Sequence, residues 1–125
     1  MKYRVFFVNR AFKELVDKSL LENLLESKND GFYKKQLDYF LVDISPNKIL
    51  KDAIEYFKYR DDIVYKDDGI ILSNKVTKEI ATLTLKEQEV ILEANIEDNP
   101  LMTFLYCYYR PIITIECDRI ELLGE

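Results

Sequence analysis

The residues of this chain that could do chemistry most directly are carboxylates, and four of them fall close together. Asp61, Asp62, Asp67 and Asp68 lie within eight residues, and oxygen-rich clusters of this kind can hold calcium or magnesium. Their spacing does not match the calcium loop of an EF-hand, which alternates acidic ligands and ends in a glutamate. We therefore expect solvated turn residues, or a surface that contacts a partner, rather than a metal site.

A second group of carboxylates lies near the C-terminus. Glu116 and Asp118 would share one face of a strand, and together with Asp43 they could form the acidic core of a magnesium-dependent nuclease. A lysine at the spacing that such a site uses is missing, and alternating polar residues on the outer face of an edge strand explain the same pair. An enzyme that uses carboxylates and magnesium is accordingly the weakest of three functional hypotheses.

Three tyrosines gather beside an arginine. Tyr106, Tyr108, Tyr109 and Arg110 belong to the residue types that are enriched at the centres of protein interfaces. The run of strand-forming residues at 101–109 predicts a strand on which Tyr106 and Tyr108 point the same way. That face is either an exposed contact surface or a part of the core beneath a helix. Replacing Tyr108 by alanine separates the two, because a core residue would lose stability and a contact residue only binding.

Histidine is absent, and cysteine occurs twice. The absence of histidine excludes Ser-His-Asp and Cys-His nucleophiles, imidazole acid-base catalysis and metal sites that contain histidine. Cys107 and Cys117 match neither a redox pair nor half of a zinc site, and in a hairpin around Arg110 and Pro111 their sulfurs would lie apart. We expect both thiols to be free and buried.

Charge divides the chain into two unequal halves. Residues 1–60 hold 12 basic and 9 acidic residues, a net charge of +3, whereas residues 61–125 hold 6 and 14, a net charge of −8. An acidic surface of this kind favours a partner with a basic surface. The basic residues are scattered and form neither a basic face nor a glycine-rich phosphate loop, so direct binding of nucleic acid is not expected.

Length and composition predict one domain, 1–125, with one core. The 125 residues are 48% hydrophobic, with nine tyrosines and seven phenylalanines, and include only three glycines and three prolines. This is enough apolar material for a core and too little glycine and proline for long loops. The first ten residues contain only four consecutive apolar positions, and nothing later is long enough to span a membrane. We expect a cytoplasmic protein that does not bind membranes.

The first half of the sequence alternates strand and helix signals. Residues 2–8 are dense in aromatic and β-branched types, which predicts a strand at the centre of a sheet. Apolar residues then recur at helical spacing until 29–31, which predicts a helix. A strand is expected at 37–44, and Ser45 followed by Pro46 predicts the cap and first residue of a second helix.

The middle of the sequence contains the clearest hairpin signal. Two short β-branched runs flank Lys66-Asp67-Asp68-Gly69, a tetrad that favours a turn. Residues 73–83 are predicted as a helix capped by Ser73. Residues 84–96 suit a helix or a strand equally, and periodicity does not decide between them.

The C-terminal part is expected to be sheet. Residues 101–109 and 112–118 are predicted as strands, with Pro111 at an edge, a bulge or the connection between them. Ile113 and Ile115 would face inward, and the polar residues between them would face solvent. The fold class that follows is α+β, a mostly antiparallel sheet with two to three helices in a single layer.

Short pieces of the C-terminal half carry a resemblance. Asp68-Gly69-Ile70-Ile71-Leu72-Ser73-Asn74-Lys75-Val76 combines a strand with a Ser-x-Lys helix start, and after Leu83 and Tyr108 comes Ile115-Glu116-Cys117-Asp118, an Ile-x-x-Asp strand. In these pieces the chain resembles some bacterial polymorphic-toxin immunity proteins. The resemblance implies a cytosolic protein that binds and neutralises a cognate toxin, with no catalytic residues to carry over.

These observations favour a binding protein over an enzyme. We expect a small acidic inhibitor of a partner protein, either a toxin-immunity protein or a bacterial or phage mobile-element protein that blocks a host defence factor. The alternative is a structural or regulatory subunit of a larger assembly, joined through a mainly apolar interface. No catalytic residue, metal or cofactor is assigned. The residues expected to contact the partner are Asp61, Asp62, Tyr65, Asp67, Asp68, Tyr106, Tyr108 and Arg110.

Overall fold

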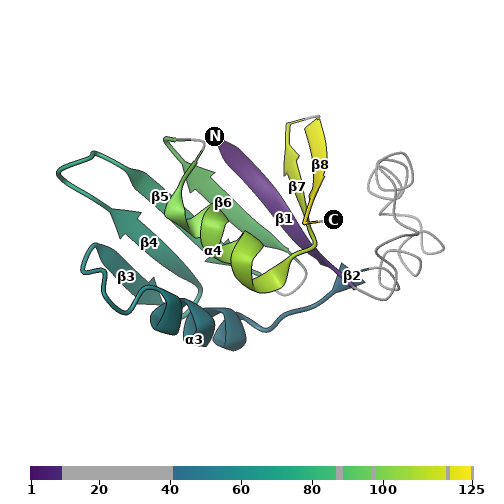
Figure 1. Ribbon diagram of the computed structural model, residues 1–125, viewed down its shortest axis with the longest axis horizontal. Helices are drawn as coiled ribbons and strands as arrows, with labels where there is room; N and C mark the ends of the chain where they lie inside the picture. Colours follow the sequence, from purple (N-terminus) through teal and green to yellow (C-terminus); the bar gives the residue numbers. More distant parts are fainter. Residues whose placement is uncertain (10–40, 87–88, 97, 118, 125) are drawn as a thin grey trace.

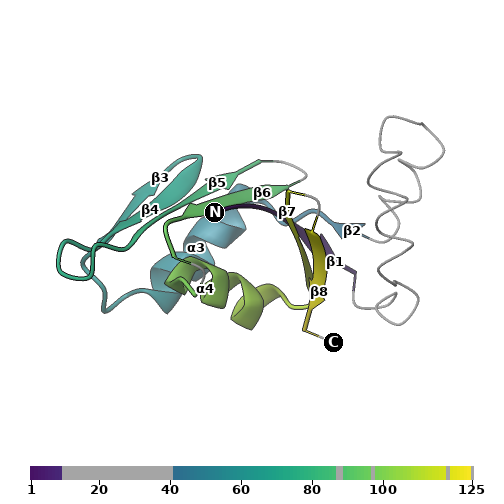
Figure 2. The same ribbon diagram turned by 90° about the horizontal axis from the view of Figure 1, so that it is seen from above.

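A curved antiparallel sheet and two helices make up the described part of the protein (Figure 1). The computed structural model describes residues 1–9, 41–86, 89–96, 98–117 and 119–124. The helices are α3 (Pro46–Tyr56) and α4 (Pro100–Tyr109), and Figure 2 shows both on the same side of the sheet. The expected α+β class is confirmed. The strands are β1 (Lys2–Val8), β2 (Leu41–Val42), β3 (Ile63–Lys66), β4 (Gly69–Ser73), β5 (Ile80–Leu85), β6 (Val90–Ala94), β7 (Ile112–Glu116) and β8 (Arg119–Leu123).

The sheet has the strand order β3-β4-β5-β6-β1-β7-β8, and its paired strands are antiparallel. β3 to β6 form a meander in which consecutive strands pair. β1 lies between β6 and β7, because Arg4 pairs with Ile91 on one side and with Ile115 on the other. β2 pairs with the end of β1, where Val8 lies opposite Leu41. The predicted central position of the first strand is therefore confirmed.

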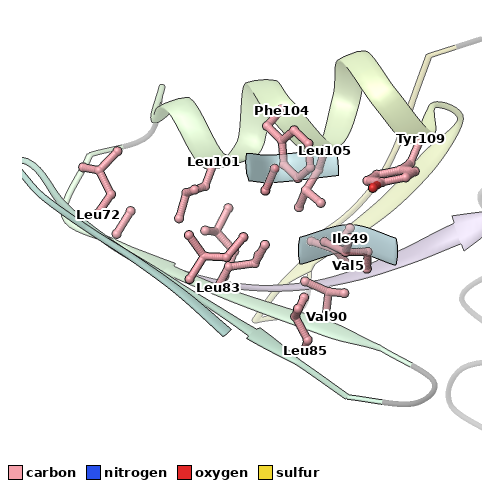
Figure 3. Packing of buried hydrophobic residues seen from close by; sticks show 14 of the residues in the cluster. Val5, Ile49, Leu72, Leu83, Leu85, Val90, Leu101, Phe104, Leu105 and Tyr109 are labelled. Atoms are coloured by element: carbon pink, nitrogen blue, oxygen red, sulfur yellow. The ribbon is translucent and has the colours of Figure 1, made fainter. Parts of the chain in front are cut away.

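The larger core lies between the sheet and the two helices. Val5, Leu83 and Leu92 point from the sheet toward α4 and are fully buried. Burial of one such side chain stabilises the fold by about 1.5–3 kcal/mol. Figure 3 shows how α4 meets them with residues at helical spacing, which are Leu101, Phe104, Leu105 and Tyr109.

A smaller cluster occupies the other face of β1, β7 and β8. Phe6 and Val8 are buried there with Ile113 and Ile120, and Leu41, Ile115 and Leu122 pack against them. Alternate residues of β1 therefore enter two different clusters. This explains why the four residues Val5–Val8 are apolar and buried in succession.

The start of α3 follows the sequence signal. The Ser45 hydroxyl accepts a hydrogen bond from the Lys48 backbone N–H at 3.2 Å, and Pro46 occupies the first turn. The two helices run antiparallel. The ring of Tyr56, at the end of α3, lies 5.4 Å from the ring of Phe104, while the Tyr109 hydroxyl near the end of α4 donates to Asp52 Oδ2 at 2.6 Å.

The predicted strand at 101–109 is wrong, because these residues form α4. Asn99 caps the helix by accepting from the Met102 N–H at 3.0 Å, and Pro100 follows at the first helical position. As a result, Tyr106 and Tyr108 do not share a face, since residues two positions apart on a helix point about 200° away from each other around its axis. Pro111 lies in the connection from α4 to β7.

The predicted helix at 73–83 is also wrong. Residues 74–78 form a loop in which the Asn74 side chain accepts hydrogen bonds from the backbone N–H groups of Val76 and Thr77, both at 3.0 Å, and Val76 is 91% exposed. β5 then begins at Ile80, and its alternating burial matches a strand. Of the two alternatives for 84–96, a helix or a strand, the structure has a strand, β6, at Val90–Ala94. The predicted hairpin around 66–69 is confirmed.

Two further expectations near the C-terminus need correction. The polar face of β7 was expected to face solvent, yet Thr114 is buried because it points toward the helical layer. Cys107 and Cys117 are free thiols as expected but are exposed rather than buried. The helix expected before 29–31 and the part of the expected strand before Leu41 lie outside the described residues. Neither α3 nor α4, the helices of the described ranges, has the length and hydropathy to cross a membrane.

Candidate functional site

The outward side of α4 carries no charge along its whole length. The helix has the sequence PLMTFLYCYY, in a chain of which 33% of the residues are charged. Its solvent-exposed residues are Thr103, Tyr106, Cys107 and Tyr108. The cores of protein interfaces are depleted in charge and enriched in tyrosine, so this side of α4 has the composition of a contact surface.

Two exposed tyrosines are held in place where α4 meets α3. Tyr56 and Tyr108 are 39% and 38% exposed, and their rings lie 5.6 Å apart in an edge-to-face arrangement. Both pack on Phe104, which is fully buried, at 5.4 and 5.1 Å. Partial burial raises the pKa of the Tyr56 hydroxyl. Rings fixed in this way offer contact area at a small cost in side-chain entropy.

Tyr106 occupies the other flank of α4. The Arg110 guanidinium lies 5.7 Å from the centre of its ring, a cation–π contact that orders both side chains at the end of the helix. Tyr106 follows Met102 by one helical turn, so the two residues share a side of α4. That side faces a pocket in the molecule.

The pocket lies between the first turn of α4 and the helix-facing side of β1, β7 and β8, and it has a volume of about 170 Å³. One of its wall residues is unusual. The Oε2 atom of Glu116 is buried and accepts no hydrogen bond within the described ranges. The pocket is lined by apolar or aromatic Tyr3, Met102 and Leu123, by the carboxylates of Asp98, Glu116 and Glu121, and by Thr114 and Arg119.

A second, more open hollow separates the end of α3 from the start of α4. Its walls include Tyr56 and Thr103, and Asp98 borders it as well as the first pocket. The uncharged side of α4 therefore has a hollow on each flank. Taken together, α4, Tyr56 and the two hollows form one candidate surface, which we call the α4 surface.

The predicted acidic cluster is not brought together by the fold. Asp61 and Asp62 precede β3 whereas Asp67 and Asp68 follow it, and at ~3.3 Å per residue the ends of this segment lie roughly 20 Å apart. Asp61, Asp67 and Asp68 are exposed. They form two small acidic ends of one edge strand rather than a single patch.

Asp62 has a structural role. Arg60 donates two hydrogen bonds to its carboxylate, at 2.9 and 2.7 Å, and Asn74 donates a third at 3.0 Å. The Arg60 hydrogen bonds, with that from Asn74, outweigh the opposing effect of burial and lower the pKa of Asp62 to about 2. This network ties the loop after α3 to the loop after β4.

Tyr65 is likewise mainly structural. It is half-buried against the core, and its hydroxyl lies 3.4 Å from the carbonyl oxygen of Ala53 in α3, to which it donates. Of the predicted contact residues, the structure brings Tyr106, Tyr108 and Arg110 to the α4 surface, although on a helix rather than a strand. The three exposed aspartates lie on the separate edge formed by β3.

Sequence reasoning missed Tyr56 and the pocket. Tyr56 could have been found from the spacing of α3, since it follows Asp52 by one turn on the side that faces α4. The pocket had no comparable signal, because its walls come from three strands, a helix and a loop.

The carboxylates proposed for a magnesium site do not converge. Asp43 follows β2 at one end of β1, whereas Glu116 lies at the other end, next to Ile115, which pairs with Arg4. Asp118 lies outside the described residues. Within the ranges that the structure describes, no three Asp, Glu, Cys or His side chains are grouped so that they could hold a metal ion.

A comparison with models of known protein families and with curated proteins finds no match to this chain.

Proposed function

We propose that this protein acts by binding a partner protein through the α4 surface. The observation that carries the proposal is the uncharged outer side of α4, with Tyr108 and Tyr56 fixed on a buried phenylalanine. In the isolated protein, the exposed and uncharged side of α4 contributes little to stability. Covered by a partner, it would supply the desolvated aromatic centre on which binding energy concentrates.

The distribution of charge supports the role of an inhibitor. Residues 61–125 have a net charge of −8, and carboxylates at Asp98, Glu116 and Glu121 flank α4. A negative field around an uncharged contact area steers a basic partner toward it and strengthens the encounter. An immunity protein, or an anti-defence protein of a mobile element, that occupies the basic substrate groove of a nucleic-acid enzyme would use these features together.

A subunit of a larger assembly is the second candidate, and the same helix favours it. An apolar, tyrosine-bearing helix suits a permanent interface, in which charge contributes little. Salt distinguishes the two, because raising it from about 0.1 M to about 1 M shortens the Debye length from ~10 Å to ~3 Å. The association rate of an electrostatic inhibitor would fall over this range, whereas that of a subunit would change little.

The test is capture of a partner by the tagged protein, followed by titration of the purified complex. Cys107→Lys places a charge in the middle of the exposed side of α4, and Val64→Lys is the matched control, since Val64 is 57% exposed on the sheet face that the helices do not cover. Cys107→Lys should weaken binding at least ~10-fold, as expected for a charge at the centre of an interface, while Val64→Lys binds as the wild type does. Equal binding by both variants, with unchanged circular dichroism, would contradict the proposal.

A further inference from the structure

The pocket beside α4 contains a carboxylate oxygen without a hydrogen-bond donor. Glu116 Oε2 is buried, and no described residue donates to it. A buried acceptor left in this state costs about 1–3 kcal/mol, and more when the group is charged. The nearest cation in register is Arg119, which lies opposite Glu116 across the turn between β7 and β8 and forms an ion pair with Glu121.

The walls of the pocket define the chemistry of a ligand. Three carboxylates and one guanidinium line the pocket, and this excess of negative charge repels anions and attracts cations. Tyr3, Met102 and Leu123 provide an apolar wall that suits an alkyl chain rather than a hydrated metal ion. The volume of about 170 Å³ is more than ten times what one water needs.

We propose that this pocket receives a basic side chain of the partner protein, a lysine or an arginine, whose cationic end donates a hydrogen bond to Glu116 Oε2. The inference rests on the proposed function and names the group that the partner inserts. Met102 lies on the pocket wall and Tyr106 follows it by one turn, so a partner that covers α4 lies within side-chain reach of the pocket. The apolar stem packs along Tyr3 and Leu123, and the charge meets the carboxylates that line the pocket.

The first arm of the test needs no partner. Nα-acetyl-L-arginine amide and Nα-acetyl-L-lysine amide are titrated into the ¹⁵N-labelled protein, and the uncharged Nα-acetyl-L-norleucine amide serves as the control ligand. We expect saturable shifts of the backbone amides of Met102, Thr114 and Glu116 with the cations alone. Glu116→Gln should weaken this binding at least ~10-fold, as expected for the loss of a charge-assisted hydrogen bond.

Glu93→Gln is the matched control variant. Glu93 is an exposed carboxylate of β6 on the opposite face of the sheet, so its replacement should leave probe binding unchanged. The proposal is overturned if no saturable shift occurs, if norleucine amide binds as well as the cations, or if Glu116→Gln binds as the wild type does. A thermal melt of each variant verifies that the fold persists.

The second arm identifies the source of the cation. Agmatine presents the same guanidinium on a free alkylamine. If it binds at least tenfold more tightly than the acetylated amino acids, the pocket serves a free amine and the proposal fails. In the complex with the partner, Glu116→Gln should weaken binding at least ~10-fold whereas Glu93→Gln should not. If Cys107→Lys abolishes the complex but Glu116→Gln leaves it intact, the proposed function stands and the role of the pocket is overturned.

Discussion

Replacing Asp62 by asparagine tests whether this residue holds the fold together or belongs to a binding surface. Two hydrogen bonds from Arg60 and one from Asn74 hold its carboxylate, and its pKa falls from 3.8 to about 2. Each pKa unit corresponds to about 1.36 kcal/mol, so the ionised carboxylate would stabilise the folded state by up to about 2.4 kcal/mol. The Arg60 side chain is 35% exposed, and screening by solvent reduces the expected value to about 1–2 kcal/mol.

The pH dependence gives the sign of the effect. Because the pKa of Asp62 is lower in the folded than in the unfolded state, its contribution is complete above about pH 5. It is lost as the pH falls through 3.8 toward 2. Asp62→Asn should therefore lower the free energy of unfolding by about 1–2 kcal/mol at pH 7 and by much less near pH 2.

Urea unfolding at a series of pH values measures this difference. Asp61→Asn is the control, because Asp61 is an exposed neighbour and its replacement should change stability by less than about 0.5 kcal/mol at every pH. A difference between wild type and Asp62→Asn that stays constant from pH 7 to pH 2 would refute the reasoning, as would an NMR titration that finds the Asp62 pKa near 3.8. Charge reversals meant to test partner binding should accordingly be confined to Asp61, Asp67 and Asp68.

Three further changes test other parts of the structure. Tyr109→Phe removes the hydroxyl that donates to Asp52 at 2.6 Å but keeps the ring against Phe7. Urea unfolding should show a free energy of unfolding that is lower by about 1–2 kcal/mol. The control Tyr59→Phe changes a residue that is 92% exposed and should leave the free energy of unfolding unchanged. Gly69→Ala places a Cβ 2.4 Å from the carbonyl oxygen of Leu83, and the resulting shift of β4 against β5 should lower stability by about 1–3 kcal/mol, seen as a lower Tm. Cys107 and Cys117 are both exposed, so a thiol reagent should modify both in the folded protein at a rate near that of the unfolded chain; protection of either would contradict the exposure described above.

Short sequence signals correctly predicted a helix start and a turn, which depend on a few neighbouring residues. Ser45 and Pro46 start α3, and the turn at 66–69 joins β3 to β4, as expected. Asn99 and Pro100 carry the same cap-and-proline signal and start α4, but the run of strand-forming residues at 101–109 favoured a strand. The spacing of Leu101, Phe104 and Leu105 against the core decided in favour of the helix, because tertiary packing overrides intrinsic propensity.

For the candidate site, the sequence predicted which types of residue take part but not how they are arranged. Tyrosines at 106 and 108 were expected to contact a partner, yet the helix separates them and places Tyr56 beside Tyr108 instead. Glu116 and Tyr3 come to line the same pocket because β1 pairs with β7. No local pattern encodes the register between strands that lie more than a hundred residues apart.

The position of β1 also determines the order in which the strands of the sheet can pair during synthesis. β3 to β6 pair with their sequence neighbours, so this meander can form soon after its residues leave the ribosome. β1 is made before this meander but fills a slot between β6 and β7, which begin only at Val90 and Ile112. Until both strands are made, the apolar stretch Val5–Val8 of β1 stays without the strands that pair with it, and an unpaired segment of this kind favours aggregation of the growing chain.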